Sequence, residues 1–212
     1  MSGRVARGLQ VAAACLIVAA FAGLSHYCNS VPGAGDFGAA LALTPVTVVA
    51  LALTWRGAPR PIAALLTVGL AGVFYASWPF LRQHFPLVSL VQESAVYALL
   101  GLTFGRSLLP DQVALCTRLA DKVHGPLTPR EVWYTRRVTA AWALYFVAIA
   151  AISIGLYAYA PLRLWSFYIN FCVLPLLGAM FVGEYLVRRR LLPRGHRAGL
   201  LATVRVYFTA PQ

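Results

Sequence analysis

Six apolar runs, each about as long as a bilayer is thick, constrain this chain more than any other feature. A membrane-spanning helix needs roughly 20 mainly apolar residues to cross about 30 Å of hydrocarbon. Only 11% of the residues are charged, against about 25% in a soluble domain. We predict an all-α, polytopic transmembrane helical bundle, residues 1–212 forming one domain, with six spans. The spans are placed at residues 9–25, 37–55, 61–81, 87–105, 138–160 and 164–187.

The basic residues decide the predicted orientation, because cytoplasmic loops of membrane proteins are enriched in Lys and Arg. With the N-terminus inside, all of the 18 basic residues except Arg82 and Arg163 fall in cytoplasmic segments. We therefore predict cytoplasmic N and C termini. All of these residues are arginine except Lys122, a bias typical of GC-rich bacterial genomes. The expected location is the bacterial inner (cytoplasmic) membrane, where the partner common to all such proteins is membrane lipid.

The first span has an alternative interpretation as a signal peptide. It follows the basic residues Arg4 and Arg7, and Ala20-Phe21-Ala22 resembles a small-residue cleavage site. The apolar run is longer than most signal-peptide cores, which favours a retained span. Cleavage would leave five spans.

One sizeable polar segment, residues 106–137, lies between the fourth and fifth spans and is predicted to be cytoplasmic. Apolar residues recur there at helical spacing, opposite charged ones, which predicts an amphipathic helix. The apolar positions are Val113, Cys116, Leu119, Ala120 and Val123, and the charged ones are Arg118, Asp121 and Lys122. Thr128, Pro129 and Glu131 then match a capping box with proline at the first helical position. The segment is either a docking platform for a cytosolic partner or anionic headgroups, or a positive-inside anchor whose helix covers the inner face of the bundle.

Glu93 is the sharpest candidate for an intramembrane site, because an ionisable residue inside a span costs roughly 3 kcal/mol on insertion scales. It lies beside Gln92 in the fourth span, and Asn170 is the polar residue of the sixth span. A proton relay or a contact with a polar substrate group is one interpretation. The other is a buried hydrogen bond to Asn170, Arg82 or Arg163. Asn170 and Pro175 indicate either a local kink with a polar lining in the sixth span or only packing between helices.

Glu184 stands four residues before Arg188, the favourable order for an ion pair on one helix. We predict a structural pair there. No two histidines stand at helical spacing, and the four cysteines show no zinc-like spacing. No cofactor and no metal site are expected.

Signatures of membrane enzymes are missing from the sequence. It contains no Asp-rich motif for Mg²⁺-diphosphate chemistry, no HExxH, no GxSxG and no P-loop. An enzyme is not indicated. A nucleic-acid partner is not expected either, because the basic residues sit between apolar segments rather than on an interleaved basic and aromatic face.

Three stretches carry a family resemblance: residues 104–108 (FGRSL), 134–142 (YTRRVTAAW) and 181–190 (FVGEYLVRRR). With the closing Arg205-Val-Tyr207 they resemble an uncharacterised bacterial inner-membrane family whose genes accompany aryl polyene (xanthomonadin-type) pigment biosynthesis. The resemblance covers residues 100–208 and implies a pathway rather than a reaction. It directs attention to five cytoplasmic-face residues, Arg106, Tyr134, Arg136, Arg137 and Glu184.

Three functional hypotheses follow. The first is a non-enzymatic accessory or scaffold component of aryl-polyene lipid assembly, which holds cytosolic acyl-carrier enzymes or their acidic carrier proteins at the membrane. The second is a transporter or flippase for a polyene-lipid, with Glu93, Gln92 and Asn170 lining the path. The third is a membrane-bound acyl or glycosyl transferase without a recognisable motif. The sequence leaves the ligand and the oligomeric state open.

Overall fold

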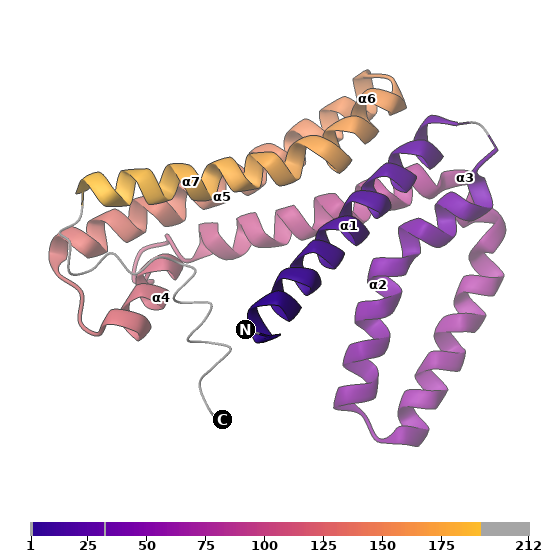
Figure 1. The fold of residues 1–212 in the computed structure, drawn as a ribbon, viewed down its shortest axis with the longest axis horizontal. Helices are drawn as coiled ribbons and strands as arrows, with labels where there is room; N and C mark the ends of the chain where they lie inside the picture. Colours follow the sequence, from indigo (N-terminus) through magenta and orange to yellow (C-terminus); the bar gives the residue numbers. More distant parts are fainter. Residues whose placement is uncertain (1, 32, 192–212) are drawn as a thin grey trace. The chain divides into compact units, whose positions relative to one another are not determined.

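The computed structural model describes residues 2–31 and 33–191, and all regular structure in this part of the chain is helical (Figure 1). The elements, in order, are α1 (Ser2–Ser30), α2 (Gly35–Gly57), α3 (Arg60–Arg106), α4 (Leu115–His124), α5 (Pro129–Tyr159), α6 (Leu162–Phe167), the π-helix η1 (Tyr168–Cys172) and α7 (Val173–Leu191). The predicted all-α class is confirmed for these residues. The closing Arg205-Val-Tyr207 lies outside them.

Four helices of the described part are long and apolar enough to cross a membrane. They are α2, α3, α5 and the continuous helix Leu162–Leu191 that α6, η1 and α7 form together. A shorter apolar helix, Cys15–Ser30, is the C-terminal part of α1. α1 continues past the predicted end of the first span and places His26 on a helix rather than in a loop.

The third and fourth predicted spans lie on one helix, α3, which is 47 residues long. At 1.5 Å per residue such a helix measures about 70 Å, more than twice the hydrocarbon thickness. The connection expected between the spans is a single residue with non-helical backbone angles, His84 (φ −119°, ψ 22°). Pro86 explains the kink, because a proline inside a helix lacks the N–H donor and crowds the carbonyl four residues earlier.

The predicted kink in the sixth span is a π-helical turn, η1, which contains Asn170 and precedes Pro175. Pro175 cannot donate a hydrogen bond to the carbonyl of Phe171, and a wider turn removes the clash that an α-helix would have there. The irregularity that the sequence indicated is therefore confirmed.

The chain divides into two compact units. Unit 1 comprises residues 1–92 and 155–171, and unit 2 comprises residues 93–154 and 172–212. In unit 2 the buried core lies along one face of α5, where Tyr134, Val138, Trp142 and Phe146 pack with Cys116 of α4. In unit 1, Trp165 of α6 is fully buried and packs edge-on against Tyr157.

In unit 1 the start of α2 packs against α3 beside its kink, where the two helices run side by side (Figure 1). Two glycines make the approach possible. A Cβ atom on Gly35 would stand 2.7 Å from the carbonyl oxygen of Arg82, and one on Gly38 would stand 2.7 Å from the ring of Phe85. A ring can rotate, whereas a helix carbonyl cannot, so Gly35 is the stricter requirement.

We expect Gly35→Ala to lower the free energy of unfolding by about 2 kcal/mol, the usual range for overpacking a close contact. The matched control is Gly72→Ala on α3, where an added Cβ meets nothing within 4 Å. That change should be neutral or slightly stabilising, because alanine favours a helix over glycine. Thermal unfolding of the purified chain in detergent measures both, and equal midpoints for the two variants would contradict the close approach.

Candidate functional site

The N-terminus of α5 begins with the predicted capping interaction. The Glu131 carboxylate accepts a hydrogen bond from the Thr128 N–H at 2.8 Å and another from the Thr128 hydroxyl at 2.7 Å. Glu131 is buried, and its carboxylate caps the N-terminus of α5, where a negative group also complements the helix dipole. Pro129 is the first residue of α5, as predicted.

α4 is the predicted amphipathic helix, and hydroxyl groups fix it to α5. Thr117 and Thr135 pair through their side-chain oxygens at 2.7 Å, and the Cys116 N–H donates to the Thr139 hydroxyl at 3.1 Å. Arg118 and Lys122 are exposed on the other face. The predicted apolar face was only partly right. Val113 lies before the helix begins and is exposed, whereas Thr117 is buried because Thr135 satisfies its hydroxyl.

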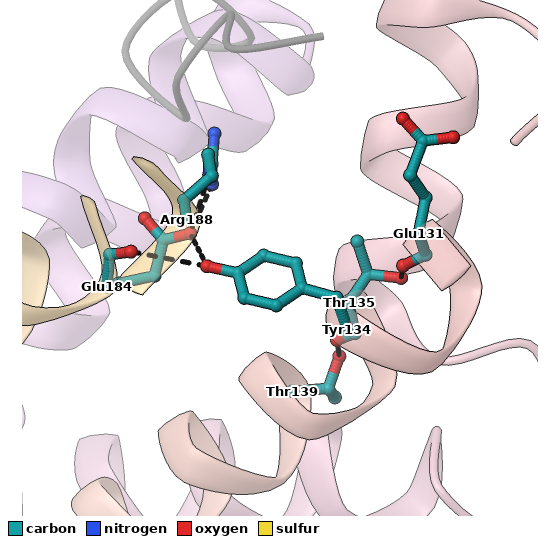
Figure 2. Close-up of polar contacts among 6 residues, drawn as sticks. All are labelled: Glu131, Tyr134, Thr135, Thr139, Glu184 and Arg188. Carbon is teal, nitrogen blue, oxygen red and sulfur yellow. Dashed lines mark hydrogen bonds and ion pairs between the residues drawn. The ribbon is translucent and has the colours of Figure 1, made fainter. Parts of the chain in front are cut away.

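Tyr134, Glu184 and Arg188 form a buried polar cluster that links α5 to α7 (Figure 2). The Tyr134 hydroxyl donates to Glu184 Oε1 at 3.1 Å and to the Glu184 backbone oxygen at 3.2 Å. Arg188 donates to the same carboxylate through Nε at 2.8 Å and also forms a close ion pair through its terminal nitrogen. The predicted Glu184–Arg188 pair is therefore confirmed. Its side chains are only 6% and 13% exposed, respectively.

The other predicted residues of this region lie around that cluster. Arg136 donates from its terminal nitrogen to the Leu108 carbonyl oxygen at 2.6 Å, tying α5 to the segment after α3. The Arg137 guanidinium lies over the Trp133 ring, 4.1 Å from its centroid. Arg106 is exposed at the C-terminal end of α3. We call the part of unit 2 made of residues 106–137 and 184–190 its basic end.

Charge at the basic end is unbalanced. Among the residues that the structure describes, no carboxylate pairs with Arg106, Arg118, Arg130, Arg136 or Arg137. Glu131 caps a helix and Glu184 binds Arg188, so the two buried carboxylates nearby are already engaged. Five exposed guanidinium groups are thus left to meet water, lipid headgroups or an acidic partner.

Glu93 lies on α3 in unit 2, as does Ser94. Glu93 Oε2 and Ser94 Oγ are both buried, and neither atom has a hydrogen-bond partner among the described residues. The hydrogen-bonded alternative for Glu93 is therefore not supported at this oxygen. Leaving buried polar atoms unpaired costs about 1–3 kcal/mol each, so such atoms call for a functional explanation.

Asn170 belongs to a different cluster, in unit 1, together with Ser166 and His26. The Asn170 side-chain N–H donates to the Ser166 carbonyl at 2.8 Å, and His26 Nδ1 lies 3.1 Å from the fully buried Ser166 hydroxyl. The His26 ring also packs edge-on against Phe171, with centroids 5.4 Å apart. Gln92 is half-buried on α3 and falls in unit 1 by the same division.

Comparison with known proteins gives no family to which these clusters can be assigned. No protein-family model, curated protein or solved structure matches the chain. The chemistry of the basic end must therefore be argued from its own residues.

The exposed arginines of the basic end offer sites for binding anions. Within residues 2–31 and 33–191 there is no group of three or more His, Cys, Asp or Glu side chains that could hold a metal ion. Guanidinium groups bind carboxylates and phosphates through paired, charge-assisted hydrogen bonds. The arrangement at the basic end suits recognition of an acidic surface or a phosphate.

Two features of these clusters were not indicated by the sequence, the contact between Tyr134 and Glu184 and the helical position of His26. Tyr134 and Glu184 were both candidates, but nothing in their spacing of 50 residues indicated that they meet. His26 follows residue 25, the predicted end of the first span, but α1 continues to Ser30. An unbroken run without proline or glycine from Leu24 to Ser30 was the available signal.

Cys116 offers a direct check of how α4 is oriented. Burial raises the pKa of its thiol, which reduces the reactive thiolate at neutral pH. We expect a polar maleimide to label Cys116 slowly at pH 7 and faster as the pH rises above the usual thiol range. Asp121→Cys, on the exposed face of the same helix, should label rapidly in a variant whose native cysteines are serine. Equal rates at pH 7 would show that α4 does not bury Cys116.

Proposed function

We propose that this chain is a six-span protein of the bacterial inner membrane whose basic end faces the cytoplasm and holds an acidic soluble partner at the bilayer. The observation that carries the proposal is the set of five exposed arginines without a carboxylate partner in the described chain. The rigid frame of α4, α5 and α7 supports it, because their hydrogen bonds fix where those arginines emerge.

Six spans with cytoplasmic termini are supported by the length of α3 and by the charge distribution. A helix of about 70 Å with a kink near its middle is long enough to cross the bilayer twice if it turns back at His84. The basic residues outside the cytoplasm would then be Arg82 and Arg163. Cysteines placed at Arg82 and Arg118 test this: an impermeant maleimide added to spheroplasts should label the first and spare the second. The reverse pattern would overturn the orientation.

For the partner, we propose an acyl carrier protein or an enzyme that carries one, acting in aryl-polyene lipid assembly. Electrostatic complementarity supports the class of partner, since a strongly acidic surface would be steered toward unpaired guanidinium groups. The resemblance of residues 104–108, 134–142 and 181–190 supports the pathway. In this role the chain positions soluble enzymes and makes or breaks no bond itself.

The test uses the full chain in detergent and a purified acyl carrier protein as the probe. Arg118→Gln/Arg130→Gln removes two exposed charges for which the structure records no internal contact. The matched control, Arg82→Gln/Arg163→Gln, removes the same charge from the side predicted to be external. We expect the first variant to bind the probe about ten-fold more weakly at low salt and the control to bind as the parent does. Equal binding by both variants would reject the proposal.

A second candidate, a transporter or flippase for a polyene-lipid, is favoured by the unpaired buried oxygens of Glu93 and Ser94. A carboxyl group buried within a span can exchange a proton or meet a polar headgroup during transfer. Glu93→Gln should then stop delivery of the finished lipid to the outer membrane while its synthesis continues. Val96→Ala on the same helix, where the side chain is 55% exposed, should leave delivery intact. Normal delivery in the Glu93 variant would remove this candidate.

A further inference from the structure

An apolar groove of about 600 Å³ lies between α3 and α5 within unit 2. Its lining is formed by Ala98, Gly101, Leu102, Gly105, Arg106, Leu109, Val147, Ala150, Ala151 and Ile154. Arg106 is the one charged residue in that lining. The volume falls in the range of sites that hold small organic ligands.

The two glycines of the Gly101-x-x-x-Gly105 stretch explain why the groove exists. A Cβ on Gly101 would stand 3.1 Å from Val147 Cγ2, so the helices touch at that level. A Cβ on Gly105 would meet nothing within 4 Å. One turn further along α3, open space therefore lies beside Gly105, and Arg106 and Leu109 also line it.

The mouth of the groove carries two cations. Arg106 is exposed and has no carboxylate partner among the described residues. Arg136 does not line the groove, but its terminal nitrogen donates to the carbonyl oxygen of Leu108 at 2.6 Å, and Leu108 is the neighbour of Leu109 in the lining. An apolar channel that opens beside two guanidinium groups complements a molecule with an apolar tail and an anionic head.

We propose that this groove binds one acyl chain of an anionic phospholipid, with the phosphate at Arg106 and Arg136. The groove is lined by residues of two helices that are long and apolar enough to span the membrane, so its natural occupant is the lipid around it. Basic pockets between transmembrane helices are suited to anionic headgroups.

A second copy of the chain fits the groove less well. Small-residue stripes can pack helices together in membranes, but a two-fold dimer would bring the same patch of each copy into contact. Both Arg106 side chains would then lie at one depth in one interface without a carboxylate between them. The positive charge of Arg106 therefore favours an anionic lipid in the groove and disfavours a dimer formed through it.

The experiment measures lipid binding to the purified full chain by native mass spectrometry, with thermal unfolding as a second readout. The probes are phosphatidylglycerol and phosphatidylcholine with identical acyl chains. Both lipids carry a phosphate, but the quaternary ammonium of phosphatidylcholine cancels its charge and would lie beside the arginines. We therefore expect phosphatidylglycerol, with its net negative charge, to bind about ten-fold more tightly.

Two kinds of variant distinguish binding of the lipid headgroup from binding of the acyl chain. Arg106→Gln should bring the affinity for phosphatidylglycerol close to that for phosphatidylcholine, while Arg56→Gln at the end of α2 should not. Gly105→Leu fills the groove and should weaken both lipids, while Gly72→Leu, in open space on the same helix, should change neither. Ala151→Leu fills the groove from α5 and replaces Gly105→Leu if that variant does not fold.

Equal binding of the two lipids by the parent chain would overturn the proposal, as would unchanged lipid binding in both groove-filling variants. A third result would also overturn the proposal. If the parent chain is a dimer, and Gly105→Leu abolishes the dimer but leaves lipid binding unchanged, the groove binds a second copy of the chain. This test is independent of the acyl carrier protein test, because neither Arg118 nor Arg130 lines the groove.

Discussion

Glu184→Ala is expected to lower the free energy of unfolding by about 3 kcal/mol, the lower end of the cost of breaking a buried ion pair. The Glu184 carboxylate accepts from Arg188 Nε at 2.8 Å and from the Tyr134 hydroxyl at 3.1 Å. Most of the loss comes from Arg188, whose guanidinium loses its carboxylate while only 13% of its side chain is exposed. Tyr134 keeps the Glu184 backbone oxygen as an acceptor.

The measurement is unfolding of the purified chain in mixed micelles by a denaturing detergent, followed by tryptophan fluorescence. Tyr134→Phe is the matched comparison. It removes the hydroxyl that donates to the two Glu184 oxygens but leaves the ion pair, and it should cost about 1 kcal/mol. Adding Arg188→Met to Glu184→Ala should restore part of the loss by removing the buried charge. If Glu184→Ala costs no more than Tyr134→Phe, the cluster does not hold α7 to α5.

Trp142→Ala should cost about 3 kcal/mol, within the range for truncating a buried large aromatic residue. Trp142 is 4% exposed and contacts Phe181 of α7 with ring centroids 4.7 Å apart and Phe146 with centroids 5.6 Å apart. Lipid tails are as apolar as leucine, so little of this cost comes from water. The cost comes from lost van der Waals contacts, because the side chains around the cavity no longer touch the Trp142 ring.

Leu144→Ala is the control for Trp142→Ala, two residues away on the same helix. Leu144 is 70% exposed, and its change should stay within about 0.5 kcal/mol. The same fluorescence assay serves only if the signal from the remaining tryptophans reports unfolding, and circular dichroism provides a second probe. Similar costs for the two variants would mean that Trp142 faces lipid and that the aromatic core of unit 2 is misplaced.

Local chemistry made the helices of this chain predictable. Apolar length indicated α2, α5 and the helix Leu162–Leu191, and the Thr128–Glu131 capping box marked the start of α5. The Glu184–Arg188 pair followed from spacing alone, because residues four apart share a helix face. Each of these predictions concerns residues close together in the sequence, and the geometry of a single helix is sufficient to place such residues relative to one another.

Rotation of the helices about their axes was not predictable, because long apolar spans give a weak signal for which face meets a neighbour. Tyr134 and Glu184 meet only because α5 and α7 turn those faces toward each other. The kink of α3 was also missed: the polar residues at 82–84 suggested a loop, but a proline after them was compatible with a helix that continues. The sidedness of the membrane and the number of crossings stay predictions.

The π turn at Tyr168–Cys172 accommodates one residue more than an α-helical turn would hold. A π turn is equivalent to one residue inserted into an α-helix, and one residue corresponds to about 100° of rotation. Deleting one residue from the turn would therefore leave a regular α-helix, with the residues after the turn still on the faces that they occupy now. A deletion in the α-helical stretch between Leu177 and Glu184 would instead rotate Glu184 by about 100° relative to Leu177, which packs against the core of unit 2, and carry it off the face that meets Tyr134. The π turn thus marks the place in this helix where a change of length by one residue is tolerated.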